Sequence, residues 1–193
     1  MLIWAFTVAA VAANTVFVWP QAWRLFRDRS AAGVSPGTWT ISVVLFSVWS
    51  AYAASIGFWA LLGANVSCLV AAVLVMYAGT RSGWSRWWAA LGAAGVTLAA
   101  AAGFLAPVLL AVVMTGAGVA LRIPQLLLLV RSKSVAGVSA TTWLLSGATA
   151  ACWLVVSASR GATAVIVANS TALAATLVLL GVLCARRPAG RQR

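Results

Sequence analysis

Long apolar runs alternate with short charged segments along the whole chain. Each run is close to the roughly 20 residues that an α-helix needs to cross about 30 Å of hydrocarbon. We expect seven such runs to form transmembrane helices. They cover residues 2–23, 38–56, 58–78, 87–105, 107–129, 141–159 and 162–185. The pattern therefore predicts an all-α integral membrane protein.

Composition supports a lipid environment and excludes an ordinary soluble domain. Of 193 residues, 64% are apolar and 7% are charged, and the mean hydropathy is +1.04. Soluble domains carry charge at about 25% of positions. Water is therefore not the main solvent of this chain.

The thirteen basic residues predict an orientation in the membrane. Eleven of them would lie on one side of the predicted helices, whereas Arg160 alone occupies the opposite loops. The positive-inside bias then places the amino terminus outside and the basic tail, 186–193, in the cytoplasm. We interpret this tail as a solvated topogenic segment with no nucleic-acid partner, and recognition of nucleic acid or lipid headgroups is the alternative. The eleven residues are Arg24, Arg27, Arg29, Arg81, Arg86, Arg131, Lys133, Arg186, Arg187, Arg191 and Arg193.

An internal repeat relates each residue to the one 104 positions later. The segment PQAWRLFRDRSAAGVSPGTW begins at Pro20, and PQLLLLVRSKSVAGVSATTW begins at Pro124. Eleven of the twenty positions are identical, and self-similarity at a fixed offset indicates a duplicated module. The register continues downstream through the pairs Ser42 and Ser146, Trp49 and Trp153, Ser55 and Ser159, Gly57 and Gly161, and Asn65 and Asn169.

The repeat predicts two three-helix bundles that lie the same way up in the membrane, because a basic loop follows the Pro-Gln helix in both. An odd number of helices per unit requires one extra crossing between the units. We predict the first repeat at 1–79, a linker with a closely packed fourth helix at 80–106, and the second repeat at 107–185. Parallel repeats of this kind place a solute between the halves near mid-depth.

Two Pro-Gln pairs in a 3+1+3 helix pattern, each followed by GVS before a Trp, resemble the PQ-loop superfamily over nearly the whole chain. Its members include the SWEET and SemiSWEET sugar transporters, cystinosin-like lysosomal amino-acid exporters and the KDEL receptor. The resemblance implies a seven-helix transporter fold and a small solute, with sugars as the first expectation.

Four residues are candidates for the solute site. Trp49 and Asn65 in the first repeat, and Trp153 and Asn169 in the second, resemble the sugar-contacting pair of SWEET and SemiSWEET proteins. An amide can match the vicinal hydroxyls of a sugar, and an indole offers a broad face to its C–H surface. The alternative is structural: amides that bond across helices and indoles that fill space.

Pro20, Gln21, Pro124 and Gln125 are expected to act in gating. Each proline removes a helical hydrogen bond and favours a kink that can serve as a hinge. The glutamines would bond the freed backbone groups, although a fixed structural kink stays an alternative.

Arg122 stands two residues before the second Pro-Gln pair. It is expected to extend its charge to the membrane interface, with binding of an anionic substrate group as the alternative.

No residue pattern indicates catalysis, a metal or a cofactor. Cys68, Cys152 and Cys184 have no CxxC spacing, and the chain contains no histidine. Asp28 is the one acidic residue, so no span carries a group suited to moving protons.

The sequence therefore predicts sugar uniport by alternating access. Transport of amino acids or other small metabolites, and a non-transporting receptor or sorting role, are the alternatives. A single chain would suffice, with association of chains left open, and residue usage suggests a bacterial plasma membrane.

Overall fold

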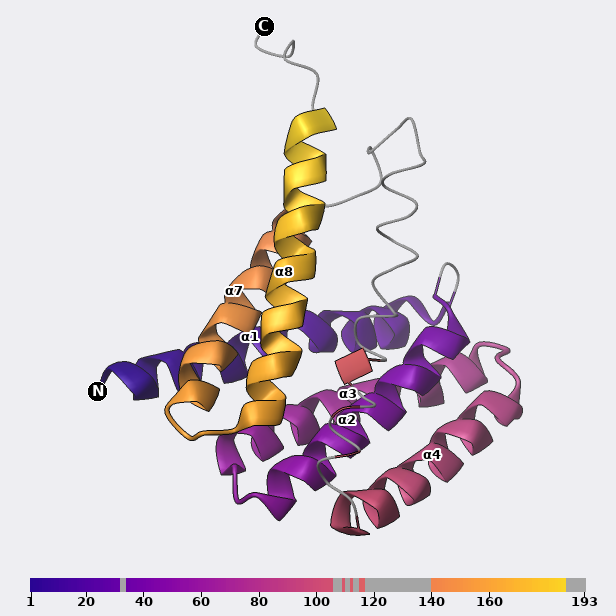
Figure 1. Cartoon of the computed structure of the whole chain (residues 1–193). Coiled ribbons are helices and arrows are strands. Elements are labelled where there is room, and N and C mark those ends of the chain that lie inside the picture. Colours follow the sequence, from indigo (N-terminus) through magenta and orange to yellow (C-terminus); the bar gives the residue numbers. More distant parts are fainter. Residues whose placement is uncertain (32–33, 106–108, 110–111, 113–114, 117–139, 187–193) are drawn as a thin grey trace, which may run out of the picture. The chain divides into compact units, whose positions relative to one another are not determined.

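The computed structural model describes residues 1–31, 34–105, 109, 112, 115–116 and 140–186. Every element in these ranges is an α-helix, so the predicted all-α class is confirmed for them (Figure 1). The predicted span 107–129 falls almost wholly outside the described residues, and the seven-helix arrangement stays a prediction. The helices are α1 (Leu2–Asp28), α2 (Pro36–Ser55), α3 (Trp59–Arg81), α4 (Arg86–Leu105), α7 (Ala140–Ala158) and α8 (Thr163–Arg186).

Four of the described helices are long and apolar enough to cross a membrane. They are α1, α2, α3 and the stretch Thr163–Ala185 of α8. The stretch Trp143–Ala158 of α7 is apolar but shorter. These lengths support a location in a membrane, because roughly 20 apolar residues span its hydrocarbon core.

The chain divides into two compact units. One is Val11–Met114, which holds α2, α3, α4 and most of α1. The other combines Met1–Ala10 with Thr115–Arg193 and holds α7 and α8. The helix predicted as a linker thus belongs to the same compact unit as α2 and α3.

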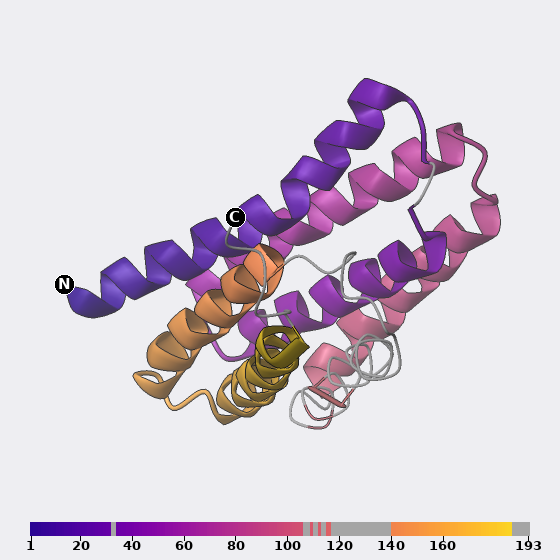
Figure 2. The same cartoon turned by 90° about the horizontal axis from the view of Figure 1, so that it is seen from above.

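In the unit Val11–Met114, helix α3 packs against α1 on one face and α2 on another. Figure 2 shows α1 running beside α3. Small side chains on α3 allow the two backbones to approach closely, which favours helix association in lipid. The buried residues of this interface are Val18, Ala22 and Leu25 of α1, and Cys68, Ala71, Val75 and Ala78 of α3.

Helix α4 packs on α2 through glycine. A Cβ atom added to Gly95 would collide with the side chain of Val44, and one added to Gly92 would lie 3.8 Å from Cγ1 of Val43. Trp88, near the start of α4, accepts a hydrogen bond through its carbonyl from the Thr40 hydroxyl at 3.3 Å. The Ala- and Gly-rich helix therefore packs closely against its neighbour, as expected from its composition.

The corner between α2 and α3 is a Schellman motif, in which backbone N–H groups beyond the helix bond to its last carbonyls. Phe58 donates to the carbonyl of Ala53 at 2.8 Å, and Gly57 donates to Ala54 at 3.2 Å. Gly57 has a φ of 66°, a left-handed conformation that glycine adopts without steric cost.

The same corner recurs 104 residues later, between α7 and α8. Ala162 donates to the carbonyl of Ser157 at 3.0 Å, and Gly161 donates to Ala158 at 3.3 Å. Gly161 has a φ of 64°. The paired residues of the sequence repeat thus build helix hairpins with the same turn.

All charged residues of the unit Val11–Met114 gather at one end. The carboxyl ends of α1 and α3 and the amino ends of α2 and α4 lie together there (Figure 2). The single acidic residue, Asp28, accepts a hydrogen bond from Nε of its neighbour Arg27 at 2.9 Å, with both side chains exposed. This end is therefore strongly basic, whereas the α2–α3 corner at the other end is uncharged. The six charged residues are Arg24, Arg27, Asp28, Arg29, Arg81 and Arg86.

We predict that Gly57→Ala and Gly161→Ala each lower the free energy of unfolding by about 1–2 kcal/mol, because an L side chain is disfavoured at positive φ. Neither added Cβ would meet an atom within 4 Å, so backbone conformation alone sets the loss. Gly63→Ala in α3 is the matched control, since it has the same free space in a helical backbone. Thermal unfolding in detergent measures all three, and equal stability of the Gly57, Gly161 and Gly63 variants would contradict this account.

Candidate functional site

The two corners fix the depth of the four predicted site residues. Trp49 and Asn65 each lie eight positions from Gly57, on opposite arms of the α2–α3 hairpin. At about 1.5 Å per residue, both side chains stand about 12 Å from the corner. For a corner that lies at the surface of a hydrocarbon core about 30 Å thick, this distance is close to mid-depth.

The second hairpin has the same construction. Trp153 and Asn169 each lie eight positions from Gly161, on α7 and α8. Each hairpin therefore carries one indole and one amide at a common level, within its own compact unit.

The two amides make the same hydrogen bond. Nδ2 of Asn65 donates to the carbonyl of Leu61 at 2.8 Å, and Nδ2 of Asn169 donates to that of Val165 at 2.9 Å. Asn65 is 5% exposed, and Asn169 is half-buried. Each amide bonds to a carbonyl of its own helix. The structural alternative, in which the amides bond across helices, is not what these two hydrogen bonds show.

Much of the hydrogen-bonding capacity of these amides is unused. A primary amide has two N–H donors and two acceptor lone pairs. Among the described residues, neither asparagine side chain makes a second hydrogen bond. The bond to the helix fixes the orientation of each amide and leaves its carbonyl oxygen for another partner.

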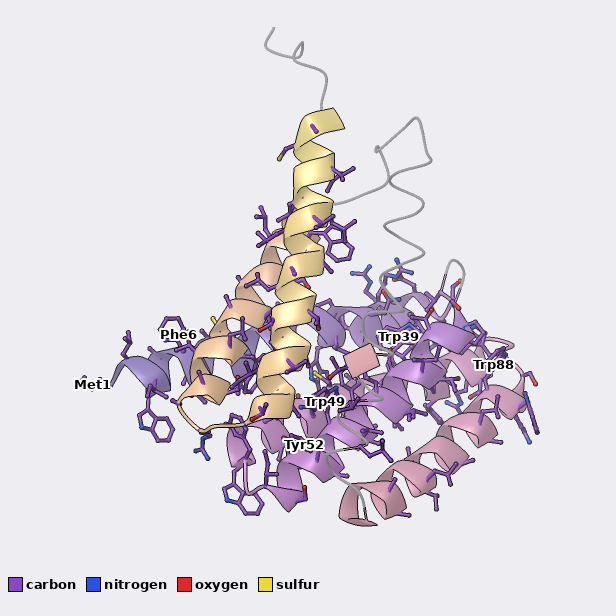
Figure 3. All side chains as sticks on the ribbon, in the orientation of Figure 1. Met1, Phe6, Trp39, Trp49, Tyr52 and Trp88 are labelled. Atoms are coloured by element: carbon purple, nitrogen blue, oxygen red, sulfur yellow. The ribbon has the colours of Figure 1, made fainter. Side chains whose placement is uncertain are left out.

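The two indoles lie in different surroundings. Trp49 is half-buried, and its ring meets Tyr52 edge-on with centroids 5.7 Å apart and planes at 88° (Figure 3). Trp153 is 3% exposed, and Val156 takes the place of Tyr52 in the repeat. The amides thus follow the repeat in their bonding, whereas the aromatic surroundings do not.

Helix α1 is continuous through Pro20 and Gln21, and it changes direction along its length (Figure 2). The side-chain nitrogen Nε2 of Gln21 is buried and has no hydrogen-bond partner among the described residues. It therefore does not donate to the carbonyl of Val16 that Pro20 leaves unbonded. Pro124, Gln125 and Arg122 lie outside the described residues.

Polar contacts between α1 and α3 involve residues that the repeat does not pair. Nε1 of Trp19 donates to the Ser67 hydroxyl at 3.0 Å, and Sγ of Cys68 approaches the carbonyl of Asn14 at 3.5 Å. The counterparts of Trp19, Ser67, Cys68 and Asn14 are Ile123, Thr171, Ala172 and Gly118, so none of the four is matched across the repeat. An amide inside the apolar span 2–23 was the signal that could have found Asn14.

Within the ranges that the structure describes, no group of three or more His, Cys, Asp or Glu residues could hold a metal ion. The resemblance to the PQ-loop superfamily rests on the repeated motifs themselves. No model of a known family matches the chain, and no curated protein matches it either.

Proposed function

We propose that this chain is a PQ-loop-type membrane transporter that moves small neutral solutes, foremost mono- or disaccharides, by alternating-access facilitated diffusion. The observation that carries the proposal is the repeated amide at mid-depth. Asn65 and Asn169 share one hydrogen bond to their own helix and keep the rest of their capacity unused among the described residues.

The chemistry of the amide and the indole suits a sugar. A sugar hydroxyl that donates to the amide oxygen adds a hydrogen bond that lipid cannot supply, and one such bond contributes about 0.5–1.5 kcal/mol. The half-buried face of Trp49, held by its edge contact with Tyr52, can cover the apolar C–H surface of a pyranose ring. A neutral solute fits because charged residues of the unit Val11–Met114 stand only at its basic end.

Uniport is the simplest mechanism for this residue set. The single carboxylate, Asp28, is exposed beside Arg27 at the end of α1, away from the depth of the amides. Proton-coupled carriers use carboxylates or imidazoles within their spans. We propose that the two repeats rock around the central site. Pro20 and Pro124 would act as hinges, and Gln21 and Gln125 would take part in the same gating.

The basic end of each half is proposed to face the cytoplasm, with the amino terminus outside and the protein in a bacterial plasma membrane. Transport of amino acids or other small metabolites is the alternative, followed by a receptor or sorting role. A receptor for a charged peptide needs charge at the site, to which only Arg122 could contribute.

We predict that Asn65→Leu and Asn169→Leu each reduce sugar uptake into proteoliposomes by about tenfold or more, because each removes a polar partner but keeps the volume. Ser55→Ala and Ser159→Ala are matched controls, since each hydroxyl donates at 2.8 Å to a carbonyl in the last turn of the helix before its corner. Labelled glucose, sucrose and a panel of amino acids serve as solutes. Wild-type uptake in both asparagine variants would move the site elsewhere, and uptake of amino acids alone would favour the alternative solute.

We predict that the initial rate of sugar uptake is the same with and without an imposed pH gradient, and that the internal concentration never exceeds the external one. The reason is that the spans carry no carboxylate or imidazole. Initial rates and end-point concentrations in liposomes with a set internal pH measure this. Accumulation driven by the gradient would contradict uniport.

The orientation can be tested with two serine-to-cysteine variants in a background without native cysteines. Ser159 lies exposed at the α7–α8 corner, and Ser85 lies exposed just before α4 at the basic end. We expect a membrane-impermeant maleimide to label Ser159→Cys in intact cells and Ser85→Cys only after permeabilisation. The reverse pattern would overturn the assigned orientation.

A further inference from the structure

Helix α1 has one exposed face and one buried face. Val16 is 61% exposed and Trp23 is 70% exposed, whereas Val18 and Leu25 pack into the interface with α3. Asn14 lies four residues before Val18, a spacing that puts both on the same face of a helix. An amide is thus carried on the side of α1 that faces protein.

The backbone of Asn14 contacts α3 at a level close to that of the proposed site. Sγ of Cys68 lies 3.5 Å from the carbonyl oxygen of Asn14, and Cys68 is fully buried. Asn65 precedes Cys68 by three residues, so about 4.5 Å along the axis separates their levels. Two amides on packed helices therefore stand within one helical turn of each other in depth.

The side chain of Asn14 differs in its bonding from those of Thr15 on the same helix and Asn65 on α3. Thr15 donates to the carbonyl of Val11 at 2.9 Å, and Asn65 donates to that of Leu61. Among the described residues, the Asn14 side chain makes no hydrogen bond, although it is half-buried. Within the part of the chain that the structure describes, its donors and acceptors are open to another partner, and lipid cannot supply one.

We infer that Asn14 is a third amide of the solute site and binds a hydroxyl group of the sugar beside Asn65. The inference rests on the proposed function and adds an asymmetry to it. The residue 104 positions later is Gly118, which has no side chain, so the second half supplies no counterpart. The site therefore distinguishes the two ends of its solute and binds a sugar ring in one orientation.

The test compares Asn14→Leu with Thr15→Val in proteoliposomes. Leucine keeps the volume of asparagine but cannot bond a hydroxyl, and Thr15 is a neighbour whose hydroxyl already bonds to its own helix. The solutes are the sugar that the wild type transports best and a series of its monodeoxy analogues. We expect Asn14→Leu to raise KM for the parent sugar about tenfold, the equivalent of ~1.4 kcal/mol, and Thr15→Val to leave it unchanged.

The deoxy series identifies a direct contact. For the wild type, one monodeoxy analogue should have a higher KM than the parent sugar. For Asn14→Leu, the two sugars should have the same KM, because the variant lacks the amide that binds the hydroxyl missing from this analogue. Asn14→Ser, with a shorter polar group, gives the same comparison if the leucine variant does not fold. An unchanged pattern across the series overturns the role of Asn14 and leaves the transporter proposal standing. Absence of uptake of any hydroxylated neutral solute by the folded wild type overturns both.

Discussion

The structure depends on the need to bond every polar group in a medium that offers no water. In hydrocarbon an α-helix satisfies its backbone internally, and polar side chains must find partners within reach. Several serine, threonine and asparagine side chains in the described helices donate to a carbonyl three or four residues earlier in their own helix; examples are Thr15, Ser47, Asn65, Thr149 and Asn169. Packing between helices is then left to small residues such as Ala22, Ala71 and Gly95.

Because most of these polar side chains bond within their own helix, the few groups with unused hydrogen-bonding capacity stand out. An amide has a capacity of four hydrogen bonds, and one bond to a helical carbonyl orients it without exhausting it. Asn65 and Asn169 each make one such bond, and each lies eight residues after the glycine at the corner of its hairpin. The amide nitrogen of Gln21 is buried without a partner among the described residues, beside the proline that interrupts the backbone bonding of α1. Incomplete bonding thus occurs where the proposal places solute contact and bending.

Asymmetry accompanies the repeat. The corners and the amides are matched across the 104-residue offset, but Tyr52, Ser67 and Asn14 have Val156, Thr171 and Gly118 as counterparts. Both helix hairpins of the repeat have the same turn and hold their amides at the same distance from it, because both properties follow from helix geometry and a left-handed glycine. Residues around the corners and the amides are free to differ between the two repeats.

The sequence by itself determined the all-α class, the places of the described helices within a few residues and the equivalence of the two corners. These follow from the length of apolar runs and from glycine and amide spacing, which are local properties of the chain. Tertiary structure alone decided that α4 packs on α2, that Trp49 meets Tyr52 while Trp153 is enclosed, that Gln21 lacks the expected bond, and that Asn14 faces α3. The reason is physical: hydrophobicity is nearly uniform around these helices, so the face that each one buries is chosen by small-residue packing between partners, which no single segment encodes.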